Sequence, residues 1–148
     1  MTKSFAAAVG KWSSQTGARL TATRRRAIEL LAEDMATTKP NGGRVPFLTG
    51  NLARSLLAST SGMPSTSQSP SAGGNVGAVT ATLPLTQPVW LGFQAAYARR
   101  QNYGFVGADA LGRVYNQPGS YFVEGAIANW QQIVAKAAKE MQTAVESR

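Results

Sequence analysis

The sequence predicts an α+β fold, in which a small, mostly antiparallel sheet is covered by a long helix from each end of the chain. Apolar residues recur at three- and four-residue steps over about 4–36 and again over 122–145, as in amphipathic helices. Between them, short runs at 76–85 and 89–93 have the alternation or the length of strands. At 148 residues the chain has the size of one domain, so we expect residues 1–148 to share a single core.

The first predicted helix contains two glycines, Gly10 and Gly17. Each costs about 1 kcal/mol relative to alanine inside a helix. We therefore expect a short first piece followed by a longer helix from about Thr16. After it, the proline and glycines of 37–46 predict an exposed loop.

The middle of the chain alternates short ordered pieces with polar loops. Thr49 is placed to cap a helical turn that carries Leu52 and Leu56 on one side. Residues 59–75 are nearly all small or polar, and they bury too little apolar surface to offset the entropy of ordering. We expect them to form a mobile loop.

Glycines and aromatic residues are interspersed through 97–121, which indicates an irregular, flexible excursion anchored by its rings. From Phe122 to Val145 the helical spacing continues for more than five turns without interruption. We expect this helix to bury its apolar stripe against the sheet, with Trp130 in the core.

The composition excludes many kinds of chemistry. Cysteine and histidine are both absent, which removes disulfides, thiolate and imidazole metal sites and histidine-dependent catalysis. Of the acids, only Glu29, Glu33 and Asp34 are close in sequence, and we expect them to lie on a solvated helix face rather than to form a carboxylate site. We predict no enzymatic activity, no metal and no cofactor. No membrane association is expected, because neither a 20-residue apolar run nor a signal-peptide pattern is present.

The net charge of +8 points to an anionic partner. Arg24, Arg25 and Arg26 span most of a helical turn and therefore point in different directions. They either contact DNA or an acidic neighbouring subunit, or belong to a solvated helix in which Arg25 pairs with Glu29. The second reading is favoured.

Aromatic and basic residues supply the remaining interface candidates. Arg99 and Arg100 near Tyr103 are suited either to stacking on bases or to a subunit contact, of which we favour the contact. Thr49-Gly50 lacks the rest of a phosphate-binding motif, so a capping role is favoured. The candidate interface residues are Arg24, Arg25, Arg26, Trp90, Arg99, Arg100, Tyr103, Phe105 and Tyr115.

Four segments, in order, resemble the tail-completion proteins of long-tailed double-stranded DNA bacteriophages, also called tail terminators or type 1 neck proteins. The segments are the long polar N-terminal helix, Pro46-Phe47-Leu48-Thr49-Gly50-Asn51-Leu52-Ala53-Arg54-Ser55-Leu56, Ala96-Tyr97-Ala98-Arg99-Arg100-Gln101-Asn102-Tyr103-Gly104 and Tyr121-Phe122-Val123-Glu124-Gly125-Ala126-Ile127. The residues that carry the resemblance most directly are Pro46, Thr49, Gly50, Leu52, Arg54, Ser55, Tyr97 and Gly104. Where the family usually has an acid before the aromatic-glycine pair, this chain has Asn102.

The resemblance implies a structural virion protein that forms a ring, commonly hexameric, at the head-proximal end of a phage tail. Its partners would be other copies of itself, the tail-tube protein below and the head-tail connector or stopper above, with non-specific contact to genomic DNA in the channel. It would be assembled in the host cytoplasm and reside in the virion neck. The alternatives are a stopper or tail-tube subunit and, in another class, a basic nucleic-acid-binding protein, although no known DNA-reading motif is visible.

Overall fold

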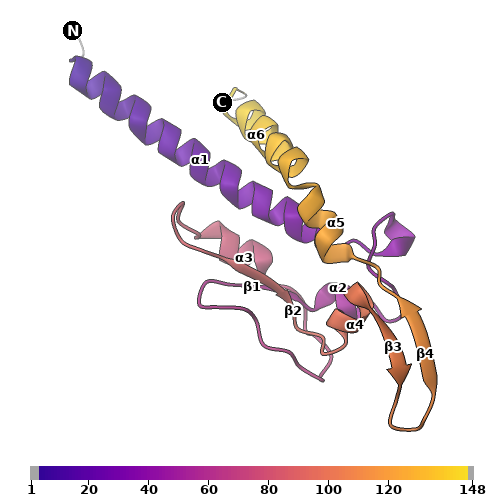
Figure 1. The fold of residues 1–148 in the computed structure, drawn as a ribbon. Helices are drawn as coiled ribbons and strands as arrows, with labels where there is room; N and C mark the ends of the chain where they lie inside the picture. The colour runs from indigo at the N-terminus through magenta and orange to yellow at the C-terminus, as the bar shows by residue number, and fades with distance from the viewer. Residues whose placement is uncertain (1–3, 147–148) are drawn as a thin grey trace.

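The computed structural model describes residues 4–146 and confirms the α+β class (Figure 1). Its antiparallel strands form two separate two-stranded ribbons, not the one small sheet expected. The elements are α1 (Phe5–Ala36), a 3-10 turn (Lys39–Asn41), α2 (Asn51–Arg54), β1 (Leu56–Ser59), α3 (Val76–Ala81), β2 (Trp90–Phe93), α4 (Ala98–Tyr103), β3 (Gly104–Ala108), β4 (Val114–Pro118), α5 (Phe122–Ala128) and α6 (Trp130–Glu146).

Helix α1 is continuous over 32 residues, so the predicted division near Thr16 is wrong. Ser4 caps its start, because the Ser4 hydroxyl accepts a hydrogen bond from the Ala7 N–H at 3.2 Å. Gly10 and Gly17 lie within the helix with open space around them. A break would leave roughly eight backbone groups without intrahelical partners, which outweighs the cost of two glycines.

Helix α6 packs alongside α1 rather than on a sheet (Figure 1). The buried residues at this contact are Ala27, Leu30, Ile133 and Ala137. Their small and branched side chains let the two helices approach closely. The expectation that the C-terminal stripe would cover the sheet is therefore confirmed only for its first part, because Phe122 and Ala126 pack against residues of β1 and β2 whereas the stripe of α6 packs against α1.

The C-terminal helical region is also interrupted, contrary to the uninterrupted helix expected. It divides at Asn129 into α5 and α6, and the Asn129 side-chain amide donates to Asp34 Oδ2 of α1 at 3.0 Å. Trp130 begins α6 and is 40% exposed, so its predicted place in the core is wrong. The break redirects the chain so that α5 and α6 follow different parts of α1.

The core lies where the C-terminal end of α1 meets β1, β2 and α5. One buried cluster contains Ala32, Met35, Leu56 and Ala126, and a second contains Val45, Leu52, Ala95, Ala98 and Phe122. Phe122 meets Phe93 edge to face, with ring centroids 4.9 Å apart. Because Val45 is fully buried, the stretch 37–46 is only partly the exposed loop expected.

The predicted strand at 89–93 is confirmed as β2, which pairs with β1 so that Leu56 faces Phe93. The predicted strand at 76–85 is wrong, because 76–81 form helix α3. Val76, Thr80 and Leu83 turn inward at helical spacing there, with Thr80 and Leu83 almost completely buried. Contact with α1 selects this helix over the strand favoured by local propensity.

The irregular excursion expected at 97–121 is wrong, since this stretch forms α4 and the β3–β4 hairpin. Gly104 has a φ of +87°, and a Cβ there would lie 2.6 Å from the Gln117 carbonyl oxygen. The Asp109 carboxylate closes the hairpin by accepting the N–H groups of Leu111 and Arg113, each at 2.9 Å. Gly104 therefore permits the close approach of two strands, and glycine in this stretch does not indicate disorder.

Residues 60–75 contain no helix or strand apart from an isolated bridge between Ser67 and Ala95. The loop is nevertheless attached to the rest of the subunit on the C-terminal side of that bridge. The Ser71 N–H donates to Asn51 Oδ1 at 2.7 Å, and the Asn75 side chain exchanges two hydrogen bonds with the backbone of Ala58. Its mobility stays a prediction.

Candidate interaction surfaces

Two of the segments that carry the family resemblance meet in space. The Asn51 side-chain amide donates to the Tyr97 hydroxyl at 3.0 Å. The two segments line a shared hollow of about 190 Å³, which includes Pro46, Leu52 and Tyr97. Ser55 is buried, and its hydroxyl donates to the Leu52 carbonyl at 2.7 Å. These residues therefore form one structural unit at the base of β1.

Thr49 and Gly50 shape the start of α2. The Thr49 hydroxyl accepts the Asn51 N–H at 3.3 Å, whereas Gly50 occupies the cap position itself with a φ of +78°. Arg54 donates back to the Thr49 carbonyl at 3.2 Å, and a Cβ on Gly50 would lie 2.8 Å from its guanidinium. Gly50 is the N-cap residue and no side chain caps α2, so the capping role predicted for Thr49 is wrong. The Thr49 hydroxyl binds only the first N–H of the helix, from the position before the cap.

Arg24 and Arg25 bind backbone carbonyls of the segment after α3. Arg24 donates to the carbonyls of Pro84 at 2.9 Å and Gln87 at 2.6 Å, and Arg25 donates to the Leu83 carbonyl at 2.9 Å. Both guanidiniums thus donate to groups within the subunit. The two arginines therefore hold the 83–87 segment against α1.

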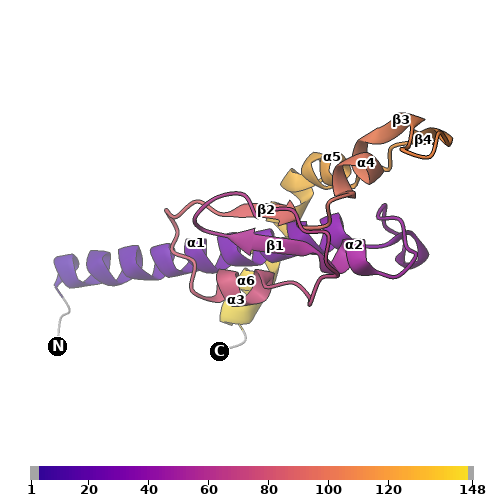
Figure 2. The same ribbon diagram turned by 90° about the horizontal axis from the view of Figure 1, so that it is seen from below.

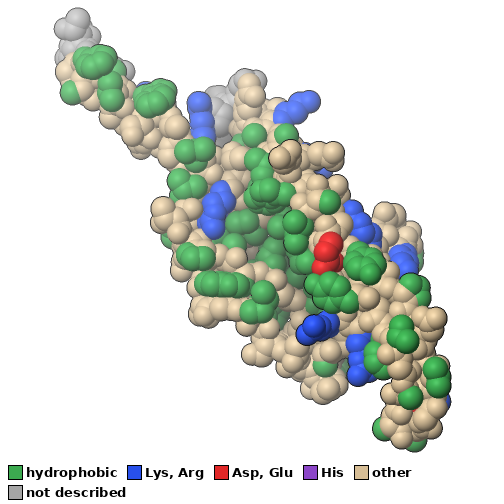
Figure 3. Space-filling view, in the orientation of Figure 1, with side chains coloured by type: hydrophobic (Ala, Val, Ile, Leu, Met, Phe, Trp, Pro, Cys, Tyr) green, Lys and Arg blue, Asp and Glu red, His purple; other side chains and the backbone are tan. Residues whose placement is uncertain are grey.

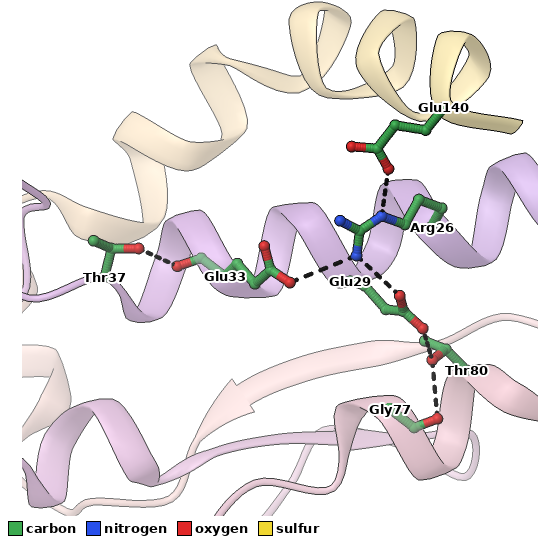
Figure 4. A network of polar contacts seen from close by, with 7 residues as sticks. All are labelled: Arg26, Glu29, Glu33, Thr37, Gly77, Thr80 and Glu140. Atoms are coloured by element: carbon green, nitrogen blue, oxygen red, sulfur yellow. Dashed lines mark hydrogen bonds and ion pairs between the residues drawn. The ribbon is translucent and has the colours of Figure 1, made fainter. Parts of the chain in front are cut away.

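Arg26 lies at the centre of a carboxylate network (Figure 4). Its guanidinium contacts Glu140 at 2.6 Å, Glu29 at 3.2 Å and Glu33 at 3.6 Å, and Glu29 also accepts the Thr80 hydroxyl at 2.8 Å. The predicted Arg25–Glu29 pair is therefore wrong, because Arg26 is the member of the trio that faces both Glu29 and α6. The Glu140 hydrogen bond raises the pKa of Arg26, and the same bond lowers the pKa of Glu140.

Most of the other interface candidates gather on α4 and the hairpin. The Arg100 guanidinium lies 4.5 Å from the centre of the Phe105 ring, and Phe105 lies 6.1 Å from Tyr115. Arg99 and Tyr103 are exposed nearby on α4. Trp90 lies apart from them, half-buried on β2. The structure thus brings five of the nine candidates to one end of the molecule.

Asn102, the position at which the chain departs from the family pattern, joins α4 to α5. Its buried side chain donates to Glu124 at 2.8 Å and accepts the Val123 N–H at 3.1 Å. Burial raises the pKa of Glu124, but hydrogen bonds from Tyr103 and Asn102 outweigh it and the net pKa is lowered. Within residues 4–146, Glu124 forms no ion pair, so its charge is stabilised by neutral donors.

The N-terminal arm, defined as residues 5–20 of α1, extends away from the rest of the subunit (Figure 2). Phe5 is 85% exposed and Trp12 is 68% exposed, and Val9 and Leu20 are also exposed. The sequence pattern identified these residues as apolar at helical spacing, but it did not indicate that they remain exposed in the folded subunit. The structure explains this exposure, because α1 has 32 residues whereas α6, which packs along it, has only 17.

The hairpin projects from the opposite end of the molecule (Figure 1). Every residue of β4 is exposed. Val106, Leu111 and Val114 are each about 80% exposed. Both ends of the subunit thus present apolar side chains that its own core does not cover.

A third surface is an apolar groove of about 660 Å³, defined here by Met35, Met63, Leu91, Phe93, Phe122 and Val123. Arg99 and Tyr103 lie at its edge. The space-filling view shows hydrophobic side chains gathered in a hollow on the central face of the molecule, and others along both projections (Figure 3). Such a surface is suited to receiving an apolar partner.

The described residues 4–146 contain no cluster of three or more acidic, cysteine or histidine side chains that could hold a metal ion. None of their helices combines the length and apolar composition needed to cross a bilayer. No protein-family model, curated protein or solved structure matches the chain.

Proposed function

We propose that this chain is a non-enzymatic structural subunit of a homo-oligomeric ring at the head-proximal end of a phage tail. In this role it completes the tail and joins it to the head connector. One observation carries the proposal: apolar side chains on two projections at opposite ends of the subunit are left exposed by the rest of the described residues, 4–146. Monomeric soluble proteins rarely expose such surface unless it binds a partner.

The family resemblance supports the tail-completion role in particular. Its second and third segments lie side by side through Asn51 and Tyr97, so the resemblance covers one unit of the structure rather than scattered positions. The balance of structure also favours this role over a tube subunit. The chain is about 52% helix and 16% strand, whereas a tube subunit is expected to contain more strand and less terminal helix.

The arrangement of basic residues argues against a dedicated nucleic-acid-binding protein. Arg24, Arg25 and Arg26 were the strongest basic cluster in the sequence, and all three bind groups inside the subunit. Exposed cations such as Lys11 and Arg19 are dispersed along α1. This distribution suits weak contact with DNA inside a channel rather than a continuous binding surface.

Electron microscopy of the intact virion tests the proposal. We expect density for this chain as a ring between the head connector and the first ring of the tail tube. A ring on the connector side alone would assign the chain as a stopper, and absence of the chain from mature particles would refute a structural role. In that case, salt-dependent DNA binding by the purified protein would be measured next.

A further inference from the structure

We infer that the N-terminal arm of each copy binds the apolar groove of the next copy, in a head-to-tail contact repeated around the ring. This inference rests on the proposed homo-oligomeric ring and specifies how its subunits join. A contact between two different surfaces of one chain is heterologous, and it closes into a ring when the rotation between neighbours permits.

The arm has the pattern of a helix that binds in a groove. Phe5, Val9 and Trp12 are separated by four and three residues, so they lie along one face of the helix. Apolar anchors at this spacing are the usual means by which an amphipathic helix binds a hydrophobic groove. All residues from 4 to 15 are exposed, so this face is uncovered along its whole length.

The groove has matching chemistry. Its walls include Phe93, Phe122 and Val123, and its volume of about 660 Å³ is sufficient for large side chains. Met35 and Met63 add flexible thioethers, which adapt to irregular contacts and interact favourably with aromatic rings. An aromatic anchor such as Trp12 or Phe5 would therefore find aromatic and sulfur partners there.

The arm cannot enter the groove of its own chain. Met35 belongs to the groove and also to α1, so arm and groove are joined by a continuous helix. At about 1.5 Å per residue, Trp12 and Met35 lie roughly 35 Å apart along its axis. The arm can therefore reach a groove only on another copy.

A second copy satisfies both surfaces at once. Aromatic side chains bury about 150–250 Å² each, so Phe5, Val9 and Trp12 together would bury roughly 400 Å² of the arm. Each copy takes part in two such contacts, once through its arm and once through its groove. Each single contact is about half of the roughly 800 Å² per partner of a standard interface, and each copy is held in the ring by two such contacts.

The charges are compatible with this contact. The arm contains the exposed cations Lys11 and Arg19 and no acid. Beside the groove, Glu124 carries a negative charge that pairs with neutral donors only, within the part of the chain described. Arg99 lies at the same edge, so the cations of the arm have to approach from the Glu124 side.

Cysteine cross-linking tests the contact directly, because the chain contains no cysteine of its own. Trp12→Cys and Met63→Cys proteins, both altered at exposed positions, are mixed in equal amounts and treated with a short bis-maleimide. We expect a Trp12→Cys/Met63→Cys dimer as the main product. A chain with both changes should give a ladder of cross-linked oligomers that ends at the ring's copy number.

The matched control pairs Trp12→Cys with Leu111→Cys, which lies on the exposed hairpin turn. We expect at least tenfold less cross-linking for this pair. Predominant Trp12→Cys homodimers would show that arms bind each other, and equal yields for both pairs would show random collision. Either result overturns the inference.

Repeating the reaction in assembled virions separates this inference from the proposed function. A ring that contains the chain at the tail end but gives no arm-to-groove product refutes the inference and leaves the function standing. The cross-linked ladder from purified protein, together with absence of the chain from virions, supports the contact and refutes the function.

Discussion

Replacing Arg24 with glutamine should destabilise the subunit rather than remove a DNA contact. Arg24 forms two charge-assisted hydrogen bonds, to the carbonyls of Pro84 at 2.9 Å and Gln87 at 2.6 Å. A hydrogen bond to a charged group contributes about 1.5–3 kcal/mol when well shielded. The Pro84 bond is exposed and the Gln87 bond is only partly buried, so we discount both for solvent screening. The expected loss in the free energy of unfolding is about 1–2 kcal/mol.

Urea unfolding followed by circular dichroism measures this loss. With a slope of about 1–3 kcal/mol per molar urea, the midpoint should fall by roughly 0.5–1 M. Arg19→Gln is the matched control, because Arg19 lies on the same helix, is exposed and forms no hydrogen bond or ion pair with the described residues.

Both variants lose one positive charge, so they should weaken non-specific DNA binding to the same small extent. Unchanged stability in Arg24→Gln, or a selective loss of DNA affinity in that variant alone, would refute the structural role of Arg24.

Three further changes probe the core, the hairpin and the helix pair. Phe122→Ala should lower the free energy of unfolding by about 3–5 kcal/mol, because Phe122 is buried in the core. The control Ile127→Ala, on the exposed face of the same helix, should change it by less than about 0.5 kcal/mol. Chemical denaturation of the two variants measures the difference. Gly104→Ala should lower the melting temperature by several degrees, since its φ is +87° and the partner strand leaves no room for a methyl group; a wild-type melting curve would contradict this. The hydrogen bond from Arg26 lowers the pKa of Glu140. The contribution of Glu140 to stability is therefore present above the ordinary glutamate pKa and is lost as the pH falls through the lowered value. Glu140→Gln should flatten the acid limb of a stability profile measured between about pH 6 and 3.

Helical periodicity predicted both terminal helices and their approximate bounds correctly. It did not predict correctly where each helical region is continuous or interrupted, for two different reasons. The division expected near Thr16 relied on glycine propensity, which is weaker than the cooperativity of a long helix. The break at Asn129 was not expected, because it depends on a hydrogen bond to Asp34, far away in the sequence.

Among the candidate residues, sequence reasoning placed a helical turn after Thr49 and grouped the aromatic residues of 97–121, but it misassigned the cap of that turn, missed the hairpin and misassigned the arginines. Nothing local distinguishes Arg26, which binds three carboxylates, from Arg24 and Arg25, which bind carbonyls some 60 residues away. Local sequence was also insufficient for 76–81, where the alternation of residues favoured a strand but packing against α1 selects a helix.

The amino-acid sequence by itself determines the α+β class, the two terminal helices and the absence of cysteine and histidine chemistry, because these follow from composition and from spacing along a few turns. Only the tertiary structure decides which apolar face is covered. The stripe of α1 is apolar from Phe5 to Met35, yet it is buried only from Ala27 onward, where α6 and the core reach it. Burial depends on where distant segments end in space, and for that reason the exposed arm is visible in the fold and not in the periodicity.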